Sequence, residues 1–170
     1  MSETSWIWQA SDWRKARYLT WRGVCRIMGA RRSMAKTQPK RTKLSKKQQR
    51  DLDIEIEFME GVVRRDPSYI DALQILGDDY TRRGKFVNGL KIDEQLVQLR
   101  PSEPITHYNL ACSYSLTGQI ERAIESLERA VDLGYRDFTW MSKDPDLTEL
   151  RTHPAYIKLR ARLRKLKAKS

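Results

Sequence analysis

The feature that most constrains the fold of this chain is a repeat with a period of 34 residues. Displacing the sequence by one period aligns residues of similar size. The aligned pairs are Leu76 and Leu110, Gly77 and Ala111, Tyr80 and Tyr114, Gly84 and Gly118, Phe86 and Ile120, Gly89 and Ala123, Leu90 and Ile124, Val97 and Val131, and Leu99 and Leu133. Pro67 and Pro101 are separated by the same period and mark the boundaries between units, because proline does not continue a helix. A period of this length indicates a repeat architecture.

Each copy has the pattern of two antiparallel helices joined by a tight turn. Apolar residues fall at helical spacing on both sides of one glycine, Gly84 in the first copy and Gly118 in the second. Glycine at this place ends a helix in the left-handed conformation at little steric cost. The small residues Gly77 and Gly89, and their counterparts in the second copy, are expected where the two helices approach closely. The pattern therefore predicts an all-α fold.

These small, aromatic, glycine and proline positions resemble those of the tetratricopeptide repeat, and they cover two complete units, 70–103 and 104–137. The sequence departs from the family pattern at Leu73 and His107, where a tryptophan is usual, and at "LGYRD", which replaces a terminal Asp-Pro. The resemblance implies a short solenoid of αα-hairpins. It also implies that the first helices of the units line a concave groove that binds peptides.

Two units are too few for a stable array, since about three repeats are needed to bury a continuous core. Residues 45–69 place Leu52, Ile56, Met59 and Val63 on one helical face, and we interpret them as a degenerate first-repeat helix. The stretch "DLDIEIE" within them also alternates with a period of two, which is typical of a strand. Its helical context and the lack of a partner strand favour a helix.

The C-terminal residues 138–170 resemble the segment that closes bacterial arrays of this family. Their short helices are interrupted at Pro145 and Pro154, and a basic helix follows. One face of that last helix carries apolar residues, namely Tyr156, Leu159, Leu163 and Leu166. We expect this face to cap the array.

Charge divides the chain into three parts. Trp13 to Arg50 contains fourteen lysines and arginines and no acid, residues 51–150 contain eleven basic and twenty acidic residues, and residues 151–170 contain eight basic residues and no acid. Residues 1–44 are therefore predicted to be a basic, tryptophan-containing arm, disordered or loosely helical. Residues 5–28 are compatible with an interfacial helix or a targeting segment, and Met34 is an alternative start of translation.

The sequence does not favour an enzyme. It has two histidines, and His107 is expected to be buried or half-buried while His153 is expected to be exposed. Asp144, Asp146 and Glu149 lack the glycine-containing loop of a calcium site, and helix capping explains them. Neither cysteine lies in a zinc-binding motif, and the sequence has no glycine-rich phosphate-binding loop. We therefore predict no cofactor and no metal.

The predicted peptide-binding groove spans both units. Helical periodicity places on it Asp71, Gln74, Asp78 and Arg82 of the first unit and Tyr108, Asn109, Cys112 and Ser115 of the second. The first four residues offer acidic groups and the second four a neutral surface. We expect a basic or apolar peptide as the ligand, whereas solvated helix faces without a ligand are the alternative. A chaperone's terminal carboxylate is disfavoured, because only Asn109 matches the lysine, arginine and asparagine set that the family uses for it.

The basic ends suggest a second ligand class. Their lysines and arginines can contact the phosphates of RNA, DNA or an anionic membrane without sequence preference. The candidate polyanion-binding residues are Arg31, Arg32, Lys40, Arg41, Lys43, Lys46, Lys47, Arg160, Arg162, Arg164 and Lys165. Alternatively, these basic residues only keep the protein in solution and balance the negative charge of residues 51–150.

The leading interpretation is thus a non-catalytic protein-interaction or scaffold module that holds a peptide or helix. The alternatives are an adaptor whose basic ends bind nucleic acid or ribosomes while the repeats recruit a protein, and a regulatory domain of a larger enzyme complex. No apolar run reaches the ~20 residues needed to cross a bilayer, and a cytoplasmic location is expected. The open edges of a short array are compatible with a homo-oligomer.

Overall fold

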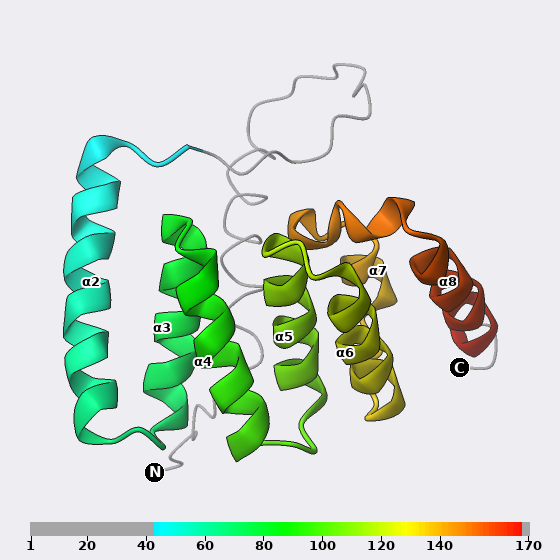
Figure 1. The fold of residues 1–170 in the computed structure, drawn as a ribbon, viewed down its shortest axis with the longest axis horizontal. Helices are drawn as coiled ribbons and strands as arrows, with labels where there is room; N and C mark the ends of the chain where they lie inside the picture. Colours follow the sequence, from blue (N-terminus) through cyan, green and yellow to red (C-terminus); the bar gives the residue numbers. More distant parts are fainter. Residues whose placement is uncertain (1–42, 168–170) are drawn as a thin grey trace, which may run out of the picture. The chain divides into compact units, whose positions relative to one another are not determined.

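A computed structural model describes residues 43–167, with side chains described as far as residue 164. All regular structure in this range is helical, as the repeat predicts. The long helices are α2 (Lys46–Arg65), α3 (Ile70–Arg83), α4 (Phe86–Leu99), α5 (Pro104–Leu116), α6 (Ile120–Asp132) and α8 (Pro154–Lys167). Between α6 and α8 lie α7 (Phe138–Met141) and two 3₁₀ turns, η1 (Pro145–Leu147) and η2 (Leu150–Thr152). Figure 1 shows the helices side by side, with each long helix packed on the next.

The first described helix, α2, begins at a capping box. The Ser45 hydroxyl accepts a hydrogen bond from the backbone N–H of Gln48, and the Gln48 side chain accepts one from the backbone N–H of Ser45. The stretch "DLDIEIE" lies inside α2, so the helical interpretation is confirmed over the strand. Leu52 and Ile56 are buried against α3, because they share the face that helical spacing assigns to them.

Both hairpins turn in the same way. Gly84 and Gly118 have φ values of 82° and 75°, a region that disfavours residues with a Cβ. After each glycine, a backbone N–H reaches back to the carbonyl of the repeat tyrosine, from Lys85 to Tyr80 at 2.8 Å and from Gln119 to Tyr114 at 2.9 Å. These bonds satisfy carbonyls that the end of a helix leaves without partners.

The two helices of the first hairpin are in close contact through glycine. A Cβ added to Gly89 would lie 3.1 Å from Thr81 Oγ1, and one added to Gly77 would lie 3.2 Å from Ile92 Cγ2. In the second hairpin the corresponding residues, Ala111 and Ala123, are fully buried. Small side chains therefore set the helix spacing in both units, as the sequence predicts.

The two tyrosines of the repeat make equivalent bonds to the preceding unit. Tyr114 of α5 donates its hydroxyl hydrogen to Glu94 Oε1 of α4 at 2.8 Å, and Tyr80 of α3 donates to Glu60 Oε1 of α2 at 2.6 Å. Glu60 and Glu94 are one repeat period apart. Because α2 contacts α3 as α4 contacts α5, we propose that α2 is the second helix of a first unit.

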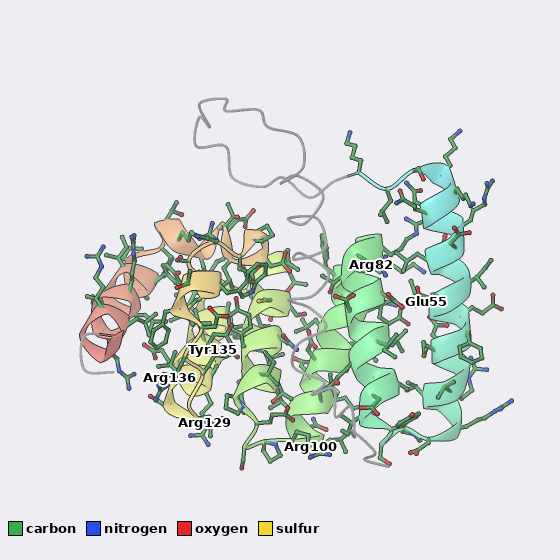
Figure 2. The ribbon with its side chains drawn as sticks, turned by 180° about the vertical axis from the view of Figure 1, so that it is seen from behind. Glu55, Arg82, Arg100, Arg129, Tyr135 and Arg136 are labelled. Atoms are coloured by element: carbon green, nitrogen blue, oxygen red, sulfur yellow. The ribbon has the colours of Figure 1, made fainter. Side chains whose placement is uncertain are left out.

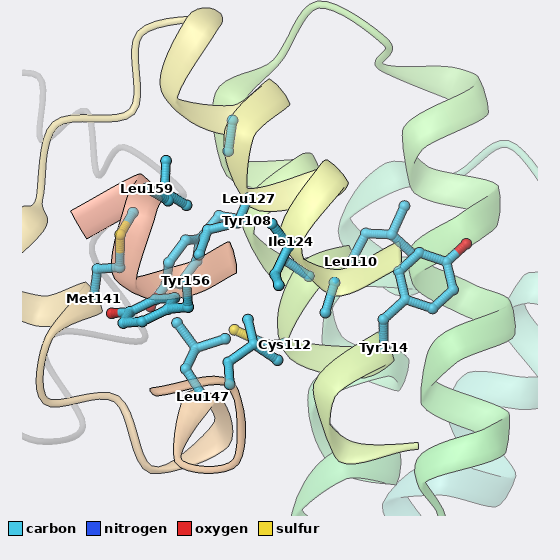
Figure 3. Close-up of a cluster of buried hydrophobic side chains, with 14 of the residues drawn as sticks. Tyr108, Leu110, Cys112, Tyr114, Ile124, Leu127, Met141, Leu147, Tyr156 and Leu159 are labelled. Atoms are coloured by element: carbon cyan, nitrogen blue, oxygen red, sulfur yellow. The ribbon is translucent and has the colours of Figure 1, made fainter. Parts of the chain in front are cut away.

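The main hydrophobic core extends from α4 to α8 (Figure 3). Leu127 of α6 is fully buried at its centre, and Met141, Leu147 and Leu150 of the short helical segments are buried beside it. The face of α8 that carries Tyr156, Leu159 and Leu163 closes this core. Among the described residues, no helix is long and apolar enough to cross a membrane.

Candidate peptide-binding face

The first half of the predicted groove is accessible. Asp71 and Arg82 are exposed, while Gln74 and Asp78 are half-buried, and all four lie along one face of α3. We call these four residues the α3 face. Two of them carry carboxylates, so this surface can accept hydrogen bonds and balance positive charge on a ligand.

The arginine of the α3 face is held by neighbouring acids. Arg82 donates to Asp79 Oδ1 at 3.0 Å and lies 3.9 Å from Glu55 Oε2 of α2. Figure 2 shows Arg82 and Glu55 reaching toward each other from adjacent helices. Because these acids partly neutralise the guanidinium, the α3 face remains acidic in character.

Asp79 lies beneath this surface and is only 1% exposed. Burial raises its pKa to about 6, the nearby Glu55 carboxylate adds to the increase, and the hydrogen bond from Arg82 opposes it. Its second oxygen, Oδ2, has no hydrogen-bond partner among the described residues. Asp79 thus makes part of the α2–α3 contact sensitive to pH near neutrality.

The second half of the predicted groove is not an exposed surface. Tyr108, Asn109, Cys112 and Ser115 of α5 are all buried, and the prediction that they face solvent is wrong. The segment between α6 and α8 explains why Tyr108 and Cys112 are buried, because Asp144 of this segment covers that side of α5. The Tyr108 hydroxyl donates to Asp144 Oδ2 at 2.6 Å, and Cys112 Sγ lies 3.8 Å from the same oxygen.

An aromatic pair reinforces this closure. The rings of Tyr108 and Tyr135 stack, with centroids 4.3 Å apart and an interplanar angle of 5°. Burial, followed by the nearby Cys112 and Asp144, raises the pKa of Tyr108 well above its usual value, so the hydroxyl stays protonated as a donor. Tyr108 is therefore a structural residue that fixes the cap to α5.

Asn109 and Ser115 are buried without full hydrogen bonding. Within the described part of the chain, Asn109 Oδ1 and Ser115 Oγ have no partner. These atoms are not presented to a ligand in this conformation. Of the two predicted halves of the groove, only the α3 face offers accessible polar groups.

The predicted polyanion-binding residues fall into two groups. Lys43, Lys46 and Lys47 are exposed near the start of α2, and Arg160, Arg162 and Arg164 are exposed on α8. Figure 1 shows α2 and α8 at opposite ends of the row of helices, so the structure does not bring the two groups together. Arg162 also bonds Asp132 of α6 at 2.6 Å. Arg31, Arg32, Lys40, Arg41 and the side chain of Lys165 lie outside the described residues.

The residues considered for catalysis or metal binding have structural partners. His107 is buried, as expected, and its Nε2 lies 2.8 Å from the carbonyl oxygen of Pro101. His153 is half-buried rather than exposed, with its Nδ1 accepting a hydrogen bond from the backbone of Ala155. The expected capping role is confirmed for Asp144, since Asp146 N–H donates to its Oδ1 at 2.9 Å. It is wrong for Glu149, which stands at the N-cap of η2 without a side-chain capping bond. The described residues contain no cluster of three or more potential metal ligands.

Sequence reasoning missed two sets of contacts. The bonds of Tyr80 to Glu60 and of Tyr114 to Glu94 could have been predicted from the sequence, because the tyrosine and the glutamate both recur at the repeat period. The bond from Tyr108 to Asp144 had no comparable signal. Its partners are 36 residues apart, and the cap that supplies Asp144 is not a repeat unit.

The geometry defines an array of helical hairpins, which is a class of protein-interaction module. Residues 105–133, which span nearly all of α5 and α6, match the family model described as "Tetratricopeptide repeat". In this segment the chain is therefore similar to the tetratricopeptide repeat family.

Curated relatives match part of the chain. Over 78 residues it is 33% identical to a chloroplastic protein of Arabidopsis thaliana, a match that covers 44% of this chain and 23% of the relative. Over 90 residues it is 32% identical to "Peroxisomal targeting signal receptor" of Komagataella phaffii, covering 52% of this chain and 16% of the relative. The matched segments thus span less than a quarter of the length of either relative.

Proposed function

We propose that this chain is a protein-interaction module that binds a basic peptide or helix along the α3 face. The observation that carries the proposal is the difference between the two units. Asp71 and Asp78 stand where the second unit has Ile105 and Cys112, and Cys112 is closed off by the cap. The accessible part of the predicted groove is therefore the acidic part.

The surroundings of the α3 face support a basic ligand. Glu55 of α2 extends the acidic character toward the start of the array. Tyr69, which occupies the N-cap position of α3 two residues before Asp71, is 47% exposed and offers an aromatic surface to a lysine or arginine side chain. Together these groups suit a peptide with alternating cationic and apolar residues.

A pull-down from lysate of the source organism tests the proposal. The bait is the full chain, with and without nuclease, compared with the variant Asp71→Lys with Asp78→Lys. The variant is expected to lose partners that the wild type retains after nuclease. Glu121→Lys with Glu125→Lys, two exposed positions of α6, makes the same change in net charge and is the matched control.

Two outcomes would overturn this proposal. Partners retained equally by the α3 variant and the wild type would place binding elsewhere. Partners lost equally from the α3 variant and the α6 control would show that net charge alone governs capture. Circular dichroism of each variant checks that the helices are intact.

A second function is favoured by the exposed cations on α8. Lys158, Arg160 and Arg164 can contact phosphates, which supports an adaptor whose basic residues bind RNA or DNA while the repeats recruit a protein. Fluorescence polarisation with a labelled single-stranded RNA tests it. Affinity should fall steeply between about 50 and 200 mM salt if phosphates make the contact, and a flat salt response would refute it. Scaffold activity and a cytoplasmic location remain predictions.

A further inference from the structure

The outer face of α2 carries exposed apolar side chains. Ile54 is 67% exposed and Phe58 is 66% exposed, one helical turn apart, on the opposite side of α2 from Leu52 and Ile56. Two exposed apolar side chains on the outer face of the first described helix are unusual, because the end of a repeat array needs a polar outer surface to stay soluble. Such a face is a candidate interaction surface.

The margin of this apolar pair is mainly acidic, with one exposed cation, Arg50, one turn before Ile54. Asp51, Glu55 and Glu57 are all exposed and lie beside Ile54 and Phe58 on the helix. We call these five residues the α2 end face. Its apolar centre and acidic margin fit a partner with an apolar centre and a basic margin.

The opposite end of the array has that character. On α8, Ile157 is 58% exposed and Ala161 is exposed one turn later, while Tyr156, Leu159 and Leu163 are buried on the other side. Exposed cations flank these two residues. We call the set formed by Ile157, Lys158, Arg160, Ala161 and Arg164 the α8 end face.

We propose that the α2 end face of one copy binds the α8 end face of a second copy. Units within the array already contact each other by helix on helix (Figure 1). The proposed contact would continue this stacking from one chain to the next. Pairing α2 with α2 would oppose carboxylates, and pairing α8 with α8 would oppose cations. Only the contact between unlike ends places opposite charges together.

A contact between unlike ends does not close on itself. Each added copy leaves one α2 end face and one α8 end face free, so association is open-ended. The faces are small, and we expect weak binding in the micromolar range or above, weakened further by salt because the margins are charged. This surface adjoins the α3 face at Glu55, which lies 3.9 Å from Arg82, but its apolar pair, Ile54 and Phe58, is not part of that face. The inference does not depend on the proposed peptide-binding function.

Sedimentation velocity of the nuclease-treated full chain tests the inference. The average mass should rise with concentration from about 1 µM to about 500 µM, and raising salt from about 50 to 500 mM should weaken association about tenfold. A chain that stays monomeric over this range refutes the proposal, and so does association that salt does not weaken.

Blocking one end at a time identifies the contact. Phe58→Asp removes the α2 end face and Ile157→Asp removes the α8 end face, so each variant alone should be monomeric. An equal mixture should form a one-to-one dimer and nothing larger, because one intact face of each kind is present. Val87→Asp, which changes a residue of α4 that is 62% exposed, is the matched control and should associate like the wild type. A mixture that remains monomeric contradicts an unlike-end contact.

Charge exchange gives a second test that keeps the apolar residues. Asp51→Lys with Glu57→Lys should abolish association, as should Lys158→Glu with Arg164→Glu. Combining all four changes in one chain restores opposite charges and should restore association to within about threefold of the wild type. Failure of the combined variant to associate, with helicity intact, would overturn the proposed pairing. Asp71→Lys with Asp78→Lys should leave association unchanged, which separates this surface from the α3 face.

Discussion

Replacement of Asp79 by asparagine should stabilise the protein at neutral pH and not in mild acid. Asp79 is 1% exposed, and its pKa is raised from 3.8 to about 6. The native state therefore binds the proton more tightly than the unfolded state between these two values. Stability derived from this group is fully present below pH 3.8 and is lost as the pH rises through 6.

The magnitude follows from the size of that shift. A shift of about two pH units corresponds to about 3 kcal/mol of stability lost by the wild type at pH 7. Asparagine removes this penalty, but it weakens the charged hydrogen bond from Arg82 by about 1 kcal/mol. We expect Asp79→Asn to raise the free energy of unfolding by about 2 kcal/mol at pH 7. Near pH 4 the gain should disappear.

Urea unfolding of the full chain, followed by circular dichroism at pH 4, 5.5 and 7, measures this difference. Asp71→Asn removes an exposed carboxylate from the same helix and is the matched control. A difference between Asp79→Asn and the wild type that is the same at all three pH values would refute the reasoning, because it would show that Asp79 does not titrate in this range.

Four further substitutions test the repeat contacts, the helix geometry and the core. Tyr114→Phe removes the bond to Glu94 and should lower the free energy of unfolding by about 1 kcal/mol in urea titrations. Gly84→Ala should cost about 1 kcal/mol because its φ is 82°, whereas Gly61→Ala, inside α2 where an added Cβ meets nothing within 4 Å, should stabilise by about 0.5 kcal/mol or more. Leu127→Ala leaves a cavity in a fully buried site and should cost about 2–5 kcal/mol by thermal or urea unfolding.

Periodicity predicts the hairpins well because their geometry is local. Gly84 and Gly118 end the first helix of each unit, and the small residues at Gly77 and Gly89 lie at the closest helix contact. Turn conformation and helix spacing depend on residues a few positions apart. Such information is present in any single unit of the sequence.

The candidate groove could be predicted only in part, because exposure depends on distant segments. Gln74 and Tyr108 occupy equivalent positions one period apart, yet Gln74 is half-buried and Tyr108 is buried beneath the cap. The difference arises from Asp144, which belongs to a non-repeating segment. Helical periodicity assigns a residue to a face, but it does not say what covers that face.

The equivalent bonds of Tyr80 with Glu60 and of Tyr114 with Glu94 have a consequence for the length of the array. The α3–α4 hairpin receives a glutamate carboxylate from α2 before it and supplies one to α5 after it. A new unit inserted between residues 103 and 104 can satisfy both neighbours if it carries the tyrosine and the glutamate at these positions. The array can therefore grow or shrink by whole units during evolution, with each junction rebuilt from the same two side chains.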